Sequence, residues 1–302
     1  MGIIVAFGRG LRNTAQHWWL AVPLYLSNLI AALIMTVPVY LFLWQLIGHR
    51  SWAQQLARGP DLNLVMDLIG LGAAARLEQG AGKGPNGLLL YLVLAGGVFL
   101  LNGLAYAFLA GGVLETLRRT GEPPAPGSPR GRQPLGVSSR SPFWPGCRRW
   151  FFPFLRLWII SFFCLSLMVL VIGLAAIATS RWYSLLAFPV LLALPLGLLG
   201  HGVVFEYARI SAVYLERRSM LRATGRAYYF FFRHFFETAT LGTILLLVAV
   251  LILALYLVLG RFATWLVLST IIGQQLYVLV GAGQKVLRLA SQLELYSMRT
   301  KR

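Results

Sequence analysis

The chain has 302 residues, of which 58% are hydrophobic and only 12% are charged. Its apolar residues form runs of about twenty or more, the length needed to cross a bilayer, so the composition excludes an ordinary soluble protein and predicts an integral membrane protein. The net charge of +18 lies in short connections between these runs rather than in a soluble basic domain. We therefore expect anionic membrane phospholipid as a partner and expect no nucleic acid.

Cysteine, histidine and acidic residues form no cluster that suggests catalysis or metal binding. Cys147 lies in a polar connection and Cys164 in an apolar run, so they give neither a disulfide framework nor a paired metal-ligand spacing, and the four histidines fall in different segments. No ionisable residue lies at the centre of a predicted span, which removes the usual groups for acid–base catalysis within a membrane. We expect no metal, no cofactor, no catalytic residue and no enzymatic activity.

Six apolar spans are predicted in chain order. They lie at about residues 20–46, 88–114, 157–177, 185–205, 238–259 and 265–282. The expected fold class is all-α: a single transmembrane domain over residues 1–302, a polytopic bundle of six transmembrane helices in three hairpins, with interfacial amphipathic helices.

Two longer connections separate these spans. Residues 61–77 carry apolar side chains at helical spacing, which predicts a short surface helix or a dip partway into the bilayer. Residues 118–149 are rich in Pro, Gly, Ser and Arg, which bury too little apolar surface to order themselves. We expect residues 118–149 to be a disordered cytoplasmic loop.

The distribution of basic residues predicts the orientation of the chain. Of the 27 Lys and Arg, 21 fall in the N-terminus, residues 118–156, residues 206–236 and the C-terminus, whereas 6 fall in the other connections. Positively charged connections stay in the cytoplasm, so both termini are expected there. The predicted location is a membrane that the chain crosses several times.

A basic and aromatic segment follows the fourth span, within residues 200–236. At about 100° per residue, Arg222, Arg226 and Arg233 fall within about 40° of one another. The far side is mostly apolar, and its members are Leu221, Tyr228, Phe231, Phe232 and Phe235. This pattern predicts an interfacial helix whose arginines face anionic phosphates. The alternative is that the arginines only set topology by the positive-inside rule.

A weak internal repeat extends this candidate surface. The segment RWFFPFLR at 149–156, before the third span, resembles RAYYFFFR at 226–233, before the fifth. Arg149 and Arg156 are therefore further candidates for binding lipid or a protein partner. The pattern fits either a threefold repeat of hairpins or the general enrichment of basic and aromatic residues at a cytoplasmic interface.

Acidic and basic residues pair by spacing at the inner ends of two spans. Glu115 and Arg118 follow the second span, and Glu206 and Arg209 follow the fourth. Residues three apart share a helix face, so both pairs are predicted to form ion pairs.

Small and polar residues inside the spans predict how the helices meet. Gly103, Ala107 and Gly111 are four apart, a spacing that allows close helix contact. The intramembrane amides are Asn28, Asn102, Gln274 and Gln275. These amides either hydrogen-bond between packed helices or line a polar path for a transported substrate.

Three motifs carry a resemblance to a known group. They are Arg9-x-x-Arg12 followed by Trp18-Trp19, AGGVLETLRR at 110–119, and FEYARI at 205–210. The chain resembles bacterial six-span membrane proteins of unassigned function, a group similar to the membrane domain fused to some glycerophosphodiester phosphodiesterases. The catalytic phosphodiesterase domain has no counterpart in this sequence.

The leading functional hypothesis is a non-enzymatic bacterial inner-membrane protein that binds anionic lipid, or a membrane-protein complex, through basic cytoplasmic helices. A transporter of a small molecule or lipid, with its path near the intramembrane amides, is the alternative. An intramembrane enzyme is the third hypothesis.

Overall fold

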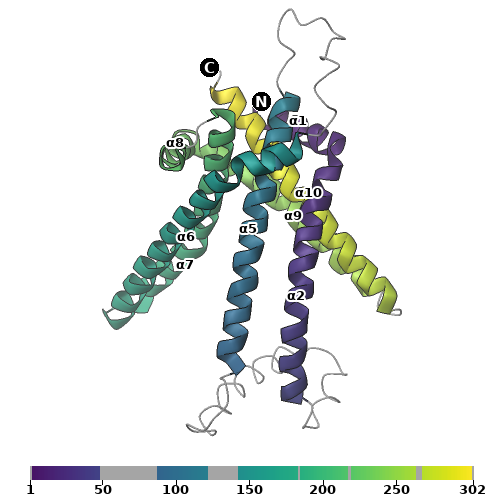
Figure 1. Ribbon diagram of the computed structural model, residues 1–302. Helices are drawn as coiled ribbons and strands as arrows, with labels where there is room; N and C mark the ends of the chain where they lie inside the picture. Colours follow the sequence, from purple (N-terminus) through teal and green to yellow (C-terminus); the bar gives the residue numbers. More distant parts are fainter. Residues whose placement is uncertain are drawn as a thin grey trace, which may run out of the picture. The chain divides into compact units, whose positions relative to one another are not determined.

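The computed structural model describes residues 2–47, 87–121, 142–182, 184–216, 219–262 and 267–300. Within these ranges every element is a helix and no strand occurs, so the all-α fold class is confirmed for them (Figure 1). The elements are α1 (Gly2–Gln16), the short 3-10 helix η1 (Trp18–Leu20), α2 (Ala21–Ile47), α5 (Gly87–Gly121), α6 (Phe143–Trp182), α7 (Ser184–Tyr214), α8 (Met220–Arg233), α9 (Phe235–Phe262) and α10 (Val267–Thr300).

The chain divides into two compact units. One contains Met1–Tyr25 and Ala105–Arg302, and the other contains Leu26–Leu104. The buried core and every side-chain cluster described below belong to the first unit. The prediction of one transmembrane domain over the whole chain stays a prediction.

Four helices of the described chain are long and apolar enough to cross a membrane. The qualifying segments are Trp18–Thr36, Gly96–Thr120, Phe143–Ala178 and Phe235–Arg261. Each segment contains an apolar stretch long enough to lie in lipid. The predicted spans at 185–205 and 265–282 fall within α7 and α10, and the total of six spans stays a prediction.

The predicted boundaries of the loop at 118–149 are wrong at both ends. Helix α5 continues to Gly121, and α6 begins at Phe143. Phe143, Cys147, Trp150 and Phe154 recur every three or four residues and are buried, so packing draws this stretch into the helix. The middle of that loop and the segment at 61–77 lie outside the described residues.

The N-terminal helix α1 was not predicted, because its charges break the apolar pattern of a span. It packs along α10, and Gly10 lies in this contact. A Cβ atom at Gly10 would lie 2.7 Å from the Cα of Ser291. The side chain of Ala6 is fully buried in a second cluster with Leu241, Leu245, Leu287 and Leu295.

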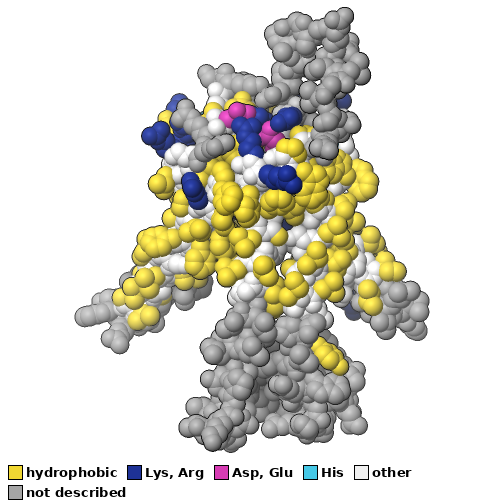
Figure 2. All heavy atoms as spheres, viewed as in Figure 1, with side chains coloured by type: hydrophobic (Ala, Val, Ile, Leu, Met, Phe, Trp, Pro, Cys, Tyr) yellow, Lys and Arg dark blue, Asp and Glu magenta, His cyan; other side chains and the backbone are white. Residues whose placement is uncertain are grey.

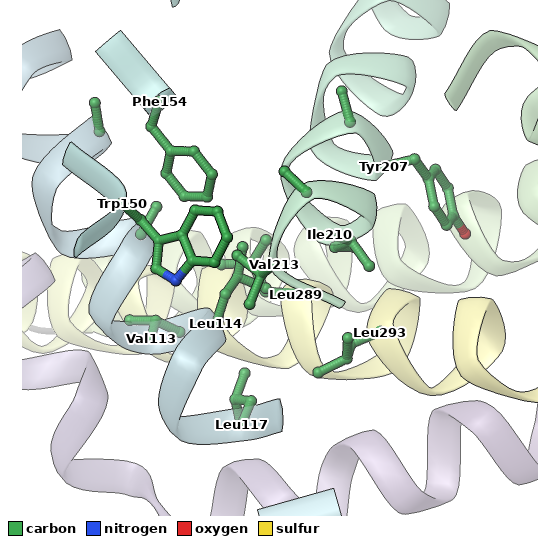
Figure 3. Packing of buried hydrophobic residues seen from close by; sticks show 14 of the residues in the cluster. Val113, Leu114, Leu117, Trp150, Phe154, Tyr207, Ile210, Val213, Leu289 and Leu293 are labelled. Carbon is green, nitrogen blue, oxygen red and sulfur yellow. The ribbon is translucent and has the colours of Figure 1, made fainter. Parts of the chain in front are cut away.

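The main core of the first unit joins η1, the start of α2, α5, α6, α7, α8 and α10. Figure 3 shows its side chains from α5, α6, α7 and α10. Its large buried side chains include Trp150, Phe154, Leu114, Tyr207 and Leu289. They belong to residues 107–117, 143–157, 204–213, 220–230 and 282–296. Charged side chains lie in or next to the same segments, among them Glu115, Arg149, Glu206, Arg226 and Arg288. We call this part of the first unit the charged end. The helices therefore interlock at the charged end.

Beyond the charged end, apolar side chains are exposed along the helices. Phe163 of α6 is 70% exposed and Leu251 of α9 is 69% exposed. On the face drawn in Figure 2, most basic side chains gather near one end, and hydrophobic side chains cover the helices beyond it. Apolar exposure of this extent suits a lipid environment rather than water.

Glycines allow α5 and α6 to approach closely. A Cβ at Gly111 would lie 2.8 Å from the Cβ of Trp150, and one at Gly112 would lie 2.7 Å from the carbonyl oxygen of Phe143. Ala107 is also buried. The predicted small-residue face therefore lies against a neighbouring helix from Ala107 to Gly111, whereas Gly103 belongs to the other unit.

Candidate functional site

Helix α8 is held against the charged end by one of its faces. Its buried side chains are Met220, Ala223, Thr224, Ala227 and Phe230. The ring of Phe230 lies 5.0 Å from that of Tyr207 in α7, and the Ser211 hydroxyl of α7 donates to the Ala223 carbonyl at 3.3 Å. These contacts fix the rotation of α8 about its axis.

The rotation of α8 leaves two other faces uncovered. Leu221 and Phe232 are 74% and 70% exposed and form an apolar face. Arg222, Arg226 and Arg233 lie on the next face around the helix, as their spacing predicts. Phe231, expected on the exposed apolar side, is instead half-buried against the core. The helix thus presents separate packed, apolar and basic faces.

A pocket of about 640 Å³ lies between the basic face of α8 and the last turns of α10. We call it the basic pocket. Its lining includes Arg226, Tyr229, Arg233, His234, Tyr296 and Arg299. Three of these six side chains carry a permanent positive charge.

Contacts around the basic pocket orient its polar side chains. Arg299 is hydrogen-bonded through Nε to a Glu237 carboxylate oxygen at 2.7 Å and forms an ion pair with the same carboxylate. Arg233 donates to the phenol oxygen of Tyr229 at 2.6 Å. Burial raises the pKa of Tyr296, so its phenol stays neutral and is able to donate a hydrogen bond.

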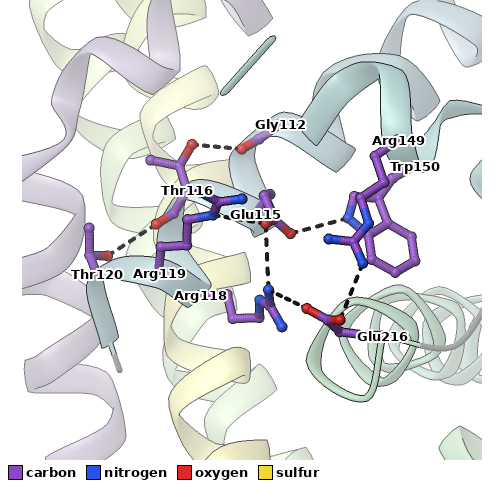
Figure 4. Close-up of polar contacts among 9 residues, drawn as sticks. All are labelled: Gly112, Glu115, Thr116, Arg118, Arg119, Thr120, Arg149, Trp150 and Glu216. Atoms are coloured by element: carbon purple, nitrogen blue, oxygen red, sulfur yellow. Dashed lines mark hydrogen bonds and ion pairs between the residues drawn. The ribbon is translucent and has the colours of Figure 1, made fainter. Parts of the chain in front are cut away.

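A buried ion network lies at the junction of α5 and α6 (Figure 4). Glu115, only 1% exposed, accepts a hydrogen bond from Arg119 Nε at 2.9 Å and one from the Trp150 indole nitrogen at 3.2 Å. Arg118 lies 3.5 Å from the same carboxylate. The predicted pair of Glu115 with Arg118 is therefore present, within a larger set of partners.

Glu216 extends this network to the end of α7. Its carboxylate pairs with Arg118 at 2.7 Å and with Arg149 at 3.3 Å. The backbone of Glu216 has φ of 52°, the left-handed conformation common just beyond a helix. Hydrogen bonds and charge from Arg118 and Arg149 lower the pKa of Glu216 below 4.5. This pairing therefore stabilises the fold above pH 4.5 and is lost as the pH falls through the lowered pKa.

The predicted ion pair between Glu206 and Arg209 is wrong. Glu206 pairs with Arg288 of α10 and accepts a hydrogen bond from Gln292 at 2.9 Å. The Arg209 guanidinium instead lies 4.9 Å from the ring centroid of Tyr106, a cation–π contact. Because α10 packs against α7, a partner between helices replaces the partner within the helix.

The other predicted binding residues have different surroundings. Arg149 contacts Glu216 and lies over the Trp150 ring at 5.3 Å, so it belongs to the ion network. Arg156 is exposed and lines a separate pocket of about 420 Å³ with Ile159 of α6 and Leu221 of α8.

The predicted intramembrane amides are divided between the two units of the chain. Asn28 and Asn102 belong to the unit Leu26–Leu104, and Gln274 and Gln275 belong to the other unit. The Tyr25 hydroxyl donates to Gln275 at 2.8 Å, which is typical of polar packing between helices, whereas Gln274 is exposed.

The charged end carries arginine side chains and no described metal cluster. Within the ranges that the structure describes, no group of three or more His, Cys, Asp and Glu side chains could hold a metal ion. Arginine guanidinium groups form paired hydrogen bonds with phosphate oxygens, and those in the basic pocket suit an anion.

Sequence reasoning found two arginines of the basic pocket, Arg226 and Arg233, and missed Arg299. It also missed Glu216 and Glu237, the carboxylates that hold neighbouring arginines. The nearest signal for Arg299 was the helical pattern of α10, but a pattern along one helix does not identify the helix that it packs against.

The chain matches no protein-family model, no curated protein and no solved structure.

Proposed function

We propose that this protein is a non-enzymatic component of a bacterial inner membrane that binds anionic phospholipid through α8 and the arginines around it. The proposal includes six spans in three hairpins with both termini in the cytoplasm. The basic face of α8 then lies at the cytoplasmic headgroups, where anionic lipids attract arginine side chains.

The observation that carries the proposal is the separation of α8 into three faces. The packed face anchors the helix, so its orientation does not depend on lipid. The exposed Leu221 and Phe232 suit the acyl boundary, and Arg222, Arg226 and Arg233 suit the phosphates beside it. A helix that only set topology would need the charges but not the exposed apolar face.

The orientation is tested by single-cysteine labelling of intact cells with a membrane-impermeant maleimide. In a Cys147→Ser, Cys164→Ser background, we expect Gly82→Cys to be labelled and Ser128→Cys to be protected until the cells are opened. The reason is the excess of basic residues in the region that contains Ser128. The opposite labelling pattern would place α8 on the external side and end the proposal.

Lipid binding is tested by changing Arg222, Arg226 and Arg233 together to Gln. We expect the purified variant to retain much less phosphatidylglycerol than the wild-type chain, since each arginine contributes roughly 1 kcal/mol of attraction to an anionic surface. Retained lipids are counted by mass spectrometry after extraction from nanodiscs. The fold should persist, because none of the three arginines belongs to the packed face.

The matched control changes the same three arginines to Lys, which keeps the charge, and should retain the lipid. If the Gln variant loses a co-purifying subunit instead of lipid, the surface binds a protein. If neither changes, the arginines serve topology alone and the proposed function fails.

A further inference from the structure

We propose that the basic pocket is a specific site for a phosphate group, and that the headgroup of an anionic phospholipid supplies it. This inference rests on the proposed function and deepens it, from a charged helix surface to a defined site shared by α8 and α10. The pocket includes Arg299, which lies 66 residues beyond Arg233 in the printed sequence.

The size and donors of the basic pocket suit a phosphate ester. Its volume of about 640 Å³ lies within the range of about 300–1,000 Å³ that is usual for small-ligand sites. Arg226 and Arg233 approach from α8 and Arg299 approaches from α10. Guanidinium groups from two directions are able to contact several oxygens of one phosphate, which a single helix face does not allow.

The charge balance of the basic pocket favours an anion. Among the described residues, Glu237 is the carboxylate that pairs with one of its arginines, and that arginine is Arg299. Arg226 forms no ion pair within the described ranges, and Arg233 donates to the neutral phenol of Tyr229. Two positive charges therefore face the same space without a carboxylate of their own, and a bound phosphate relieves their mutual repulsion.

The walls of the basic pocket strengthen such binding. The rings of Phe230 and Tyr296 lie 4.9 Å apart and form its apolar side. Apolar walls reduce local screening, so charge-assisted hydrogen bonds are stronger here than on an open surface. The same helix exposes Leu221 and Phe232, which gives acyl chains an apolar surface and favours a lipid over a soluble phosphate.

The test is a titration of the full-length protein in detergent with phosphatidylglycerol, followed by native mass spectrometry. We expect one saturable lipid adduct at physiological ionic strength. Arg226→Gln and Arg233→Gln should each raise the apparent dissociation constant at least about tenfold, because each removes charge-assisted hydrogen bonds. The dissociation constant of Arg226→Lys should lie between those of the Gln variants and the wild type, since Lys keeps the charge but lacks the planar guanidinium that forms paired hydrogen bonds.

The matched control is Arg222→Gln, which makes the same change on the same face of α8 but outside the basic pocket. It should alter the dissociation constant by about twofold or less, because a detergent micelle presents no anionic surface and the charge of Arg222 reaches a lipid in the pocket only through solvent screening. The melting temperature of each variant is measured alongside, and dissociation constants are compared among variants whose melting temperature equals that of the wild type.

The source of the phosphate is separated by competition with glycerol 1-phosphate and inorganic phosphate. If both soluble phosphates displace the lipid only at concentrations far above that of the lipid, the site recognises a lipid headgroup. If glycerol 1-phosphate binds with the same affinity as the lipid, the site takes a soluble phosphate ester. Equal losses in the Arg222, Arg226 and Arg233 variants overturn the specific site but leave the proposed function standing. If no variant loses lipid, both proposals fail.

Discussion

Replacing Glu115 by Ala is expected to lower the free energy of unfolding by about 3–5 kcal/mol, as when one partner of a buried ion pair is removed. The change leaves the Trp150 indole nitrogen without its acceptor and removes a carboxylate from beside Arg118 and Arg119. Arg118 is only 13% exposed, so water compensates poorly. Thermal unfolding in detergent, followed by tryptophan fluorescence, measures the loss.

The control for Glu115→Ala is Glu294→Ala on α10. Glu294 accepts a hydrogen bond from Asn13 at 3.2 Å and is partly exposed, so we expect a loss of about 1 kcal/mol or less. Glu115→Gln keeps the shape of the side chain and one acceptor oxygen. Its loss of unfolding free energy should therefore lie between those of Glu115→Ala and Glu294→Ala. Equal melting of the Glu115→Ala and Glu294→Ala variants would contradict the structural role of the ion network.

Replacing Gly112 by Leu is expected to separate α5 from α6 at the charged end. A Cβ at this position would already lie 2.7 Å from the Phe143 carbonyl oxygen and 2.5 Å from the Cys147 sulfur. A backbone atom has no other rotamer to adopt, so we expect a loss of about 3 kcal/mol, the upper end for overpacked sites. The fully buried Cys147 thiol should then become reactive.

The measurement is the rate at which a membrane-permeant maleimide labels Cys147 in a Cys164→Ser background. The control is Gly96→Leu on the same helix, where an added Cβ would meet nothing within 4 Å. That variant should label as slowly as the parent. Slow labelling of Gly112→Leu would show that the two helices do not meet through this glycine.

The positions of the helices followed from local properties of the sequence. Apolar length predicted the segments now seen in α2, α5, α6 and α9, because a span is recognised by its own side chains. The spacing of Arg222, Arg226 and Arg233 likewise predicted one face of α8, since helical geometry determines that face without any neighbour. The helix ends were predicted less well, because α6 begins at Phe143 through contacts with α5.

The partners of the charged residues depended on the packing of the helices. Glu206 and Arg209 satisfy the spacing rule for an ion pair, yet Glu206 binds Arg288 because α10 lies against α7. Arg299 joins Arg226 and Arg233 for the same reason, at the meeting of α8 and α10. The sequence by itself determined an all-helical chain with membrane-length apolar segments and a basic amphipathic helix. Only the tertiary structure decided which charges meet and where they enclose a pocket, because those contacts join helices far apart in the chain.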